Sequence, residues 1–378
     1  MRVSFVFPSH AFMPGGGARI ATTYANYLAQ HGHEVNLIFP CRIGVEPESL
    51  RQRTRSIQEW WKARASAAMR QLIGKSALRW MPIDPGVKLL FVPRLDARFI
   101  PDADAIFATF WLTAEYVIKF PASKGQKFYL IQGYEIWAGP KERVEATWRF
   151  PMYKVVVSDW LYHLGKTLGA HPMRHIPNAV DHRHFHIVDA SRSRPPGIIA
   201  VYYFQPMKGS QDSLSVFRRL HQRYPDIRIT MFGTDRRGRE IPDWIEYFQN
   251  PSQDLIRDLY NRHAIYVSAS YSEGWSLPPV EAMACGCAFV GTDSGGLRDY
   301  AINGRTALLS SPGDRDAMFE NLCRVIENPE LLSRLQKAGT EFIRQFTWEK
   351  SGALLEGYLS EVVNPDHHDG AIAANHAV

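Results

Sequence analysis

Residues Ser272–Gly286 read Ser-Glu-Gly-Trp-Ser-Leu-Pro-Pro-Val-Glu-Ala-Met-Ala-Cys-Gly and lie between two apolar runs, Ala264–Ala269 and Cys287–Gly291. Short apolar runs bounded by turn residues are typical of buried strands in a parallel sheet. Between them, Ser276 can cap a helix whose first turn tolerates two prolines, because the first N–H groups of a helix lack intrahelical partners. Gly286 suits the end of that helix. The segment therefore predicts strand, loop, short helix and strand, as in an α/β fold.

Two carboxylates occupy this segment, Glu273 in the loop and Glu281 one turn into the helix. Ligands of open α/β sheets bind where strands end and helices begin, and a helix N-terminus favours phosphate. Prolines cannot donate, so the phosphate-binding amides have to come from Gly274, Trp275, Ser276 and Leu277. Carboxylates can grip sugar hydroxyls by accepting paired hydrogen bonds. The segment suits a ligand with hydroxyls at both ends and phosphate in the middle, such as a nucleotide sugar.

The run from Glu273 to Gly286 resembles the signature of glycosyltransferase family 4, whose members are retaining enzymes of the GT-B fold. The resemblance implies that Glu281 holds the ribose of the donor and that Glu273 lies at the catalytic centre beside the transferred sugar. The alternative interpretation of Glu273 and Glu281 is structural, with one glutamate capping the helix and the other on the helix surface. The Leu-Pro-Pro and Ala-Met-Ala-Cys-Gly elements of the run favour the family.

The bulk composition sets limits on the class of protein. With 378 residues, 45% of them hydrophobic and 22% charged, the chain is long enough for two soluble domains. It has no run of about 18 apolar residues, so no transmembrane helix is predicted. Its first residues read as a strand and not as a secretory signal, and its four cysteines lack metal-ligand spacing. These features favour a cytoplasmic protein with reduced thiols.

Residues 41–80 hold nine Lys and Arg residues against three Glu, an excess equal to the formal charge of +6 of the whole chain. A single basic segment points to one anionic contact and not to a nucleic-acid-binding face. The segment also carries apolar residues, two tryptophans among them, at helical spacing. It predicts either a helix packed on its own domain or a basic amphipathic helix on the inner surface of a membrane.

The beginning of the chain predicts a strand, a Gly-rich loop, a helix and a second strand. The loop contains Gly15, Gly16 and Gly17 but lacks the third glycine and the acidic residue of a dinucleotide fingerprint, which argues against NAD. The family resemblance implies instead that this loop approaches the donor diphosphate. Glycine would let the backbone come close there without a Cβ clash.

Two further stretches follow predicted strands of the first half. One ends at Trp111, and the other runs from Gln132 to Glu135. Both belong to the sheet edge where ligands bind, so these three residues are candidate acceptor or sugar contacts. Ordinary polar residues at strand ends are the alternative interpretation. Many relatives carry a histidine near the second stretch, whereas this chain has Gln132, which leaves that sugar contact open.

A second strand–loop–helix–strand unit begins near Gly197 and contains Pro206-Met207-Lys208-Gly209. The family carries an arginine and then Lys-Gly in this region, where the pair clamps the diphosphate. Lys208 matches the lysine, and the resemblance makes it a catalytic residue that neutralises charge on the leaving group. Tyr202 or Tyr203 stands where the family has arginine.

The loop after the next predicted strand offers cationic and turn residues. It holds three arginines that could compensate for the missing one, Arg236, Arg237 and Arg239, or that could simply be solvated. Further along, the turn with Gln249 and Asn250 is where relatives meet the nucleobase, largely through backbone groups.

The predicted architecture is α/β, with two Rossmann-like domains of the GT-B fold facing across a cleft. Residues 1–185 form the acceptor domain, joined by a C-terminal helix at 347–363; residues 186–346 form the nucleotide-sugar domain; and 364–378 is a flexible tail. The predicted function is retaining transfer of a sugar from a nucleoside diphosphate to a hydroxyl of a glycan or lipid-linked acceptor, as in surface polysaccharide synthesis. No cofactor or metal is expected, because cationic groups can take the role of a divalent ion.

Two alternatives stay open. A nucleotide-sugar epimerase of the same fold would convert donor without an acceptor, and a noncatalytic scaffold would dock on membranes through residues 41–80. The absence of the family's arginine and histidine keeps the scaffold interpretation open, whereas the presence of Glu273, Glu281 and Lys208 argues against it. The base, the sugar, the acceptor and the oligomeric state do not follow from the sequence.

Overall fold

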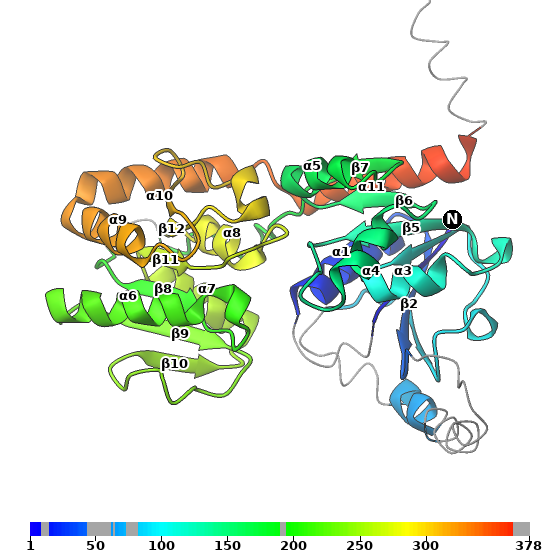
Figure 1. The fold of residues 1–378 in the computed structure, drawn as a ribbon, viewed down its shortest axis with the longest axis horizontal. Coiled ribbons are helices and arrows are strands. Elements are labelled where there is room, and N and C mark those ends of the chain that lie inside the picture. The colour runs from blue at the N-terminus through cyan, green and yellow to red at the C-terminus, as the bar shows by residue number, and fades with distance from the viewer. Residues whose placement is uncertain (9–14, 44–61, 63–64, 73–81, 190–193, 366–378) are drawn as a thin grey trace, which may run out of the picture. The chain divides into compact units, whose positions relative to one another are not determined.

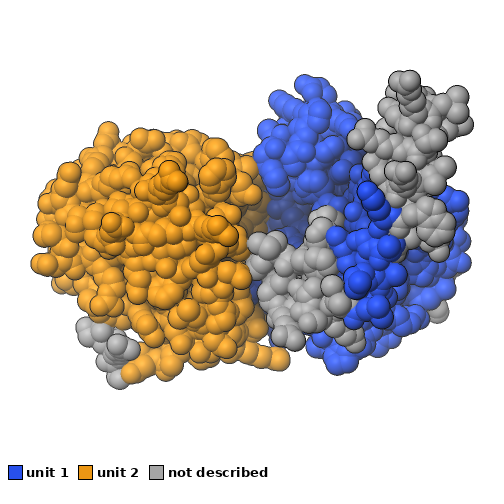
Figure 2. Space-filling model, turned by 90° about the horizontal axis from the view of Figure 1, so that it is seen from below, with its two compact units in different colours: residues 1–157, 161–176, 348–378 blue, residues 158–160, 177–347 orange. Residues whose placement is uncertain are grey.

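The computed structural model describes residues 1–8, 15–43, 62, 65–72, 82–189 and 194–365. They form two compact units (Figures 1 and 2). Unit 1 comprises residues 1–157, 161–176 and the segment from Trp348 onward, and unit 2 comprises residues 158–160 and 177–347. Residues 177–185, assigned to the first domain in the sequence analysis, belong to unit 2. The reason is local, because Val180 N–H donates to Phe346 O and the Phe185 ring packs against Tyr260.

Unit 1 is built on a parallel sheet of seven strands in the order β3-β2-β1-β4-β5-β6-β7. The strands are β1 (Arg2–Val6), β2 (Glu34–Pro40), β3 (Val87–Val92), β4 (Ala105–Ala108), β5 (Gln126–Ile131), β6 (Tyr153–Val156) and β7 (Met173–His175). The named helices are α1 (Gly16–Gln30), α3 (Trp111–Val117), α4 (Lys141–Trp148), α5 (Asp159–Thr167) and α11 (Trp348–Val363).

Aromatic side chains in register hold the centre of this sheet. Phe5, Phe107 and Phe128 occupy paired positions on β1, β4 and β5, and their rings stack with centroids 4.7 and 4.8 Å apart. Tyr358 of α11 meets the Phe128 ring edge-on at 5.7 Å, and Trp348 meets Tyr24 of α1 at 5.5 Å. The last helix of the chain is therefore part of the core of unit 1.

Unit 2 contains a parallel sheet of six strands in the order β10-β9-β8-β11-β12-β13. The strands are β8 (Ile198–Val201), β9 (Ile229–Gly233), β10 (Glu246–Gln249), β11 (Ile265–Ser268), β12 (Ala288–Thr292) and β13 (Ala307–Ser310). Its helices are α6 (Ser210–Arg223), α7 (Gln253–Arg262), α8 (Leu277–Ala284), α9 (Arg315–Glu327) and α10 (Pro329–Ile343), with α9 and α10 side by side over the sheet.

Helix α8 begins and ends for different reasons. Ser276 precedes the helix, but its side chain makes no capping bond, so that part of the prediction is wrong. A capping side chain bonds the second or third helical N–H, and here both positions are proline. The end is as predicted: Gly286 has φ +85°, its N–H bonds Met283 O, and Cys287 N–H bonds Ala282 O. This pair of bonds is a Schellman motif.

Most of the basic segment 41–80 lies outside the described residues, so its contact with a membrane stays a prediction. Residues 65–72 are helical, and Gln71 binds the edge strand β3 by donating to Leu89 O and accepting from Phe91 N. Among the described helices, none is long and apolar enough to span a bilayer.

Candidate functional site

The carboxyl ends of β8 and β11 bring the predicted residues of unit 2 together. The two strands are parallel neighbours, so the loops that follow them lie at one edge of the sheet. The loop after β8 carries Lys208, and the loop after β11 carries Glu273 and leads into α8. The central residues of the site are therefore placed by topology, although 65 positions separate them.

Lys208 and Glu273 form an ion pair. The Lys208 ammonium donates to both carboxylate oxygens of Glu273, each at 2.9 Å, and the Ser270 hydroxyl donates to Oε1 at 2.8 Å. The Glu273 side chain is 8% exposed and that of Lys208 is 24% exposed. These contacts fix the carboxylate and leave the ammonium reachable from solvent, as a phosphate-binding lysine requires.

Gly209 explains why glycine follows this lysine. It has φ +65°, and a Cβ added there would lie 1.9 Å from Ala269 O at the end of β11. Any side chain would push the loop off the strand. Gly209 therefore allows the loop to lie against β11 and to hold Lys208 beside Glu273.

Glu281 is buried on α8, with 4% of its surface exposed. Burial first, and the charge of Glu281 next, raise the pKa of Tyr260 well above its usual value. Glu273 and Glu281 both contribute, after burial, to the raised pKa of Tyr203.

The two candidate tyrosines differ in their surroundings. Tyr202 is 2% exposed, and its hydroxyl donates to Glu240. The Tyr203 ring lies under the ammonium of Lys208, 5.4 Å from the nitrogen to the ring centroid. Of the predicted compensating arginines, Arg237 donates instead to Ile241 O and Pro242 O.

The predicted amide segment, Gly274–Leu277, is held by unit 2 itself. The Trp275 side chain is 1% exposed and packs against Tyr300 and Phe346, with centroids 5.1 and 5.5 Å away. Tyr300 also donates its hydroxyl to the carbonyls of Trp275 and Ser276. Trp275 is therefore a core residue of unit 2.

A glycine turn supports the same loop. Gly296 donates its N–H to Glu273 O at 2.9 Å, and a Cβ on Gly296 would lie 1.9 Å from Gly274 O. A Cβ added at Gly295 would lie 2.6 Å from Glu273 O. Gly295 and Gly296 therefore help to fix the position of the Glu273 backbone.

The turn residues Gln249 and Asn250 have exposed side chains at the end of β10, and Asn250 N–H donates to Gly233 O at 2.6 Å with φ +47°. In the sheet, β10 is separated from β8 by β9. Both residues thus lie at the sheet edge that carries the Lys208–Glu273 pair.

In unit 1, the glycines and Gln132 come together. Gly15 precedes α1, and Gly16 and Gly17 form its first turn. The amide of Gln132 lies 3.4 Å from the position of a Cβ on Gly17. These residues share one neighbourhood at the carboxyl edge of the sheet of unit 1.

Trp111 and Glu135 are less suited to ligand contact than their sequence positions indicate. Glu135 is 7% exposed and accepts from the Trp111 N–H at 2.8 Å. Burial raises the pKa of Glu135 to about 8, against the lowering effect of hydrogen bonds from Trp111 and Tyr129. The Trp111 ring is covered by Arg143 and by Gly139. Both side chains therefore stabilise unit 1. The buried carboxylate of Glu135 binds the backbone N–H of Trp111, the first residue of α3.

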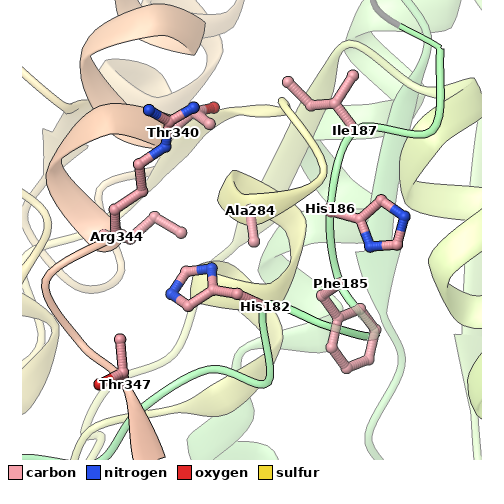
Figure 3. A pocket seen from close by; sticks show the side chains of 9 residues that line it. His182, Phe185, His186, Ile187, Ala284, Thr340, Arg344 and Thr347 are labelled. Carbon is pink, nitrogen blue, oxygen red and sulfur yellow. The ribbon is translucent and has the colours of Figure 1, made fainter. Parts of the chain in front are cut away.

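A cavity of about 480 Å³ lies elsewhere on unit 2 (Figure 3). Its lining includes His182, Phe185, Ala284 and Arg344, and none of the predicted site residues. Ala284 is the last residue of α8, so this cavity is at the opposite end of the helix from the Lys208–Glu273 pair.

Comparisons with known proteins match the part of the chain that carries these residues. The family model described as "Glycosyl transferases group 1" matches residues 183–342. Residues 183–342 are thus similar to the group 1 glycosyltransferases. The family resemblance predicted from the Glu273–Gly286 run is confirmed for this domain.

Individual relatives share part of the chain. An uncharacterised glycosyltransferase of Methanocaldococcus jannaschii is 33% identical over 155 residues, which cover 39% of this chain and 43% of that protein. The capsular polysaccharide biosynthesis glycosyltransferase CapM of Staphylococcus aureus is 23% identical over 167 residues, covering 41% and 44%. The chain thus spans less than half the length of these curated relatives.

Solved structures match this chain over nearly its whole length. Sucrose-phosphate synthase of Thermosynechococcus elongatus gives a TM-score of 0.72 at 16% identity, covering 95% of this chain and 98% of that one. HepE of Anabaena, solved with UDP-glucose, gives 0.70 at 14% identity, covering 96% and 100%. The predicted GT-B fold with two Rossmann-like domains is confirmed.

Proposed function

We propose that the protein is a retaining glycosyltransferase that moves a sugar from a nucleoside diphosphate to a hydroxyl of a glycan or lipid-linked acceptor. The observation that carries the proposal is the Lys208–Glu273 pair in front of α8, inside the group 1 domain. A cation, a carboxylate and a helix N-terminus together supply what a phosphorylated sugar needs.

Each group of the site would bind a different part of the donor. Lys208 and the amides of Gly274–Leu277 would bind the diphosphate, Glu281 the ribose and Glu273 the hydroxyls of the sugar. Gln249 and Asn250 would meet the base, and Gly15–Gly17 would approach the diphosphate. The HepE structure was solved with UDP-glucose, which supports a nucleotide-sugar ligand for this fold.

Transfer would proceed on one face of the sugar. The acceptor oxygen bonds the anomeric carbon while the bond from that carbon to the phosphate oxygen breaks, and the acceptor proton passes to the leaving phosphate. Lys208 and the helix amides stabilise the charge that develops on that phosphate. No metal is needed in this scheme, and a role in polysaccharide synthesis is supported by the similarity to CapM.

Two substitutions test the assignment. Glu281→Ala should weaken donor binding about 10-fold or more, because a ribose hydroxyl loses its charged partner. Lys208→Ala should lower kcat about 100-fold with a smaller effect on donor binding, because charge develops mainly in the transition state. Calorimetry with UDP, GDP and dTDP identifies the preferred base. A transfer assay with a nucleotide sugar of that base then measures kcat. Undiminished turnover in both variants would refute the site.

The alternatives give different results in the same assays. An epimerase converts donor without acceptor, and a scaffold binds no nucleotide. Binding at the membrane through residues 41–80 is a separate proposal, independent of the site. Flotation with anionic liposomes tests it directly.

A further inference from the structure

Tyr203 is a residue of the site that the family pattern does not provide. It is the second residue after β8, and its N–H donates to the hydroxyl of Ser210, the first residue of α6, at 2.8 Å. The residue is half-buried, and its ring centroid lies 5.4 Å from the ammonium of Lys208. The backbone of Tyr203 is therefore anchored while its ring stands beside the cation of the site.

The hydroxyl of Tyr203 can serve as a hydrogen-bond donor. Burial and the neighbouring carboxylates of Glu273 and Glu281 raise its pKa, so the phenol keeps its proton at neutral pH. Among the described residues, none forms a hydrogen bond with this hydroxyl, whereas Tyr202 next to it is bonded to Glu240. A protonated phenol among charged groups is suited to an acceptor from outside the protein.

A phosphate ligand of this site needs hydrogen-bond donors besides Lys208. Lys208 is already neutralised by Glu273, and Glu281 adds a second carboxylate. A diphosphate presents acceptor oxygens only, so it needs donors that do not depend on freeing Lys208 from its partner. The family meets this need with an arginine, and this chain has tyrosine.

We propose that the Tyr203 hydroxyl donates a hydrogen bond to a phosphate oxygen of the nucleoside diphosphate, in the place of the family's arginine. This inference rests on the proposed function. It makes Tyr203 a binding residue for the phosphates and not for the base or ribose.

The test compares two neighbouring substitutions. Tyr203→Phe keeps the ring beside Lys208 and removes only the hydroxyl, and Tyr202→Phe is the matched control, with its hydroxyl bonded to Glu240. Calorimetry measures the binding of UDP, GDP and dTDP, and of the matching nucleoside, to wild type and both variants. We expect Tyr203→Phe to weaken binding of the preferred diphosphate about 10-fold or more and to leave nucleoside binding unchanged.

The outcomes separate this inference from the proposed function. If Tyr203→Phe binds the diphosphate as wild type does, the inference is overturned while the function stands. Equal losses for diphosphate and nucleoside would also overturn it, since they indicate a packing role. A wild type that binds none of the three diphosphates overturns both. Tyr203→Arg should bind the diphosphate more tightly than Tyr203→Phe does. Melting temperatures equal to that of wild type show that the variants fold.

Discussion

Glu135 shows at the residue scale how burial changes a side chain. The sequence places this carboxylate after a strand, as a candidate sugar contact, and the structure places it against the Trp111 N–H with little exposure. Whether a polar residue at a strand end faces a ligand or the core depends on packing by distant residues, here Tyr129 and α3. Sequence position alone does not distinguish the two.

The raised pKa of Glu135 predicts a pH dependence of stability. Its folded pKa, about 8, is above its usual value, so the folded state holds this proton more tightly than the unfolded state. The stability that the Glu135 carboxyl contributes is fully present below about pH 4.5 and is lost as the pH rises through 8. We expect the free energy of unfolding of wild type to fall between pH 5 and 8, by at most about 1.4 kcal/mol per pH unit from this group.

Glu135→Gln isolates that contribution. The amide oxygen can accept from Trp111 N–H as the protonated acid does, without titrating. Urea unfolding of this variant at pH 5 and pH 8 should show a smaller loss of stability than wild type. Parallel pH profiles for the two proteins would contradict the assignment.

At the scale of the element, the loop after β8 depends on the end of β11. Gly209→Ala meets two costs, the left-handed backbone conformation and contact with Ala269 O. The conformation alone costs about 1–2 kcal/mol. Gly304 has φ +75° and nothing within 4 Å of an added Cβ, so Gly304→Ala measures that cost by itself.

We expect Gly209→Ala to destabilise the protein by more than Gly304→Ala, and to reduce kcat at least 10-fold because Lys208 is displaced from Glu273. Chemical unfolding and the transfer assay measure the two effects. Equal stability and equal kcat in the two variants would show that the loop after β8 can move away from β11 at no cost.

At the scale of the whole molecule, the chain returns to unit 1 through α11, which packs on α1. A Cβ on Gly352 would lie 2.4 Å from the Tyr27 ring, whereas one on Gly357 meets nothing within 4 Å. Gly352→Ala should therefore lower the melting temperature by several degrees. Gly357→Ala should raise the free energy of unfolding by up to about 1 kcal/mol, because alanine favours helix. Thermal unfolding followed by circular dichroism checks both; a rise in both variants would mean that α11 does not pack closely on α1.

The sequence by itself determined the elements around α8 and, through the resemblance of the Glu273–Gly286 run, the expected GT-B fold. Apolar runs, proline and glycine act through local backbone geometry, and that information is contained within about ten residues of the chain. Gly286 at the end of α8 is an example, and even the absent Ser276 cap follows from the prolines beside it.

Only the tertiary structure decided the contacts between distant residues. It selected Tyr203 over Tyr202 as the neighbour of Lys208, joined Lys208 to Glu273, and placed Trp111, Trp275 and Glu135 in the core. Such contacts depend on which strands are neighbours in the sheet and on which side of a loop faces solvent. Strand order and burial are collective properties of the packed chain, and no local pattern encodes them.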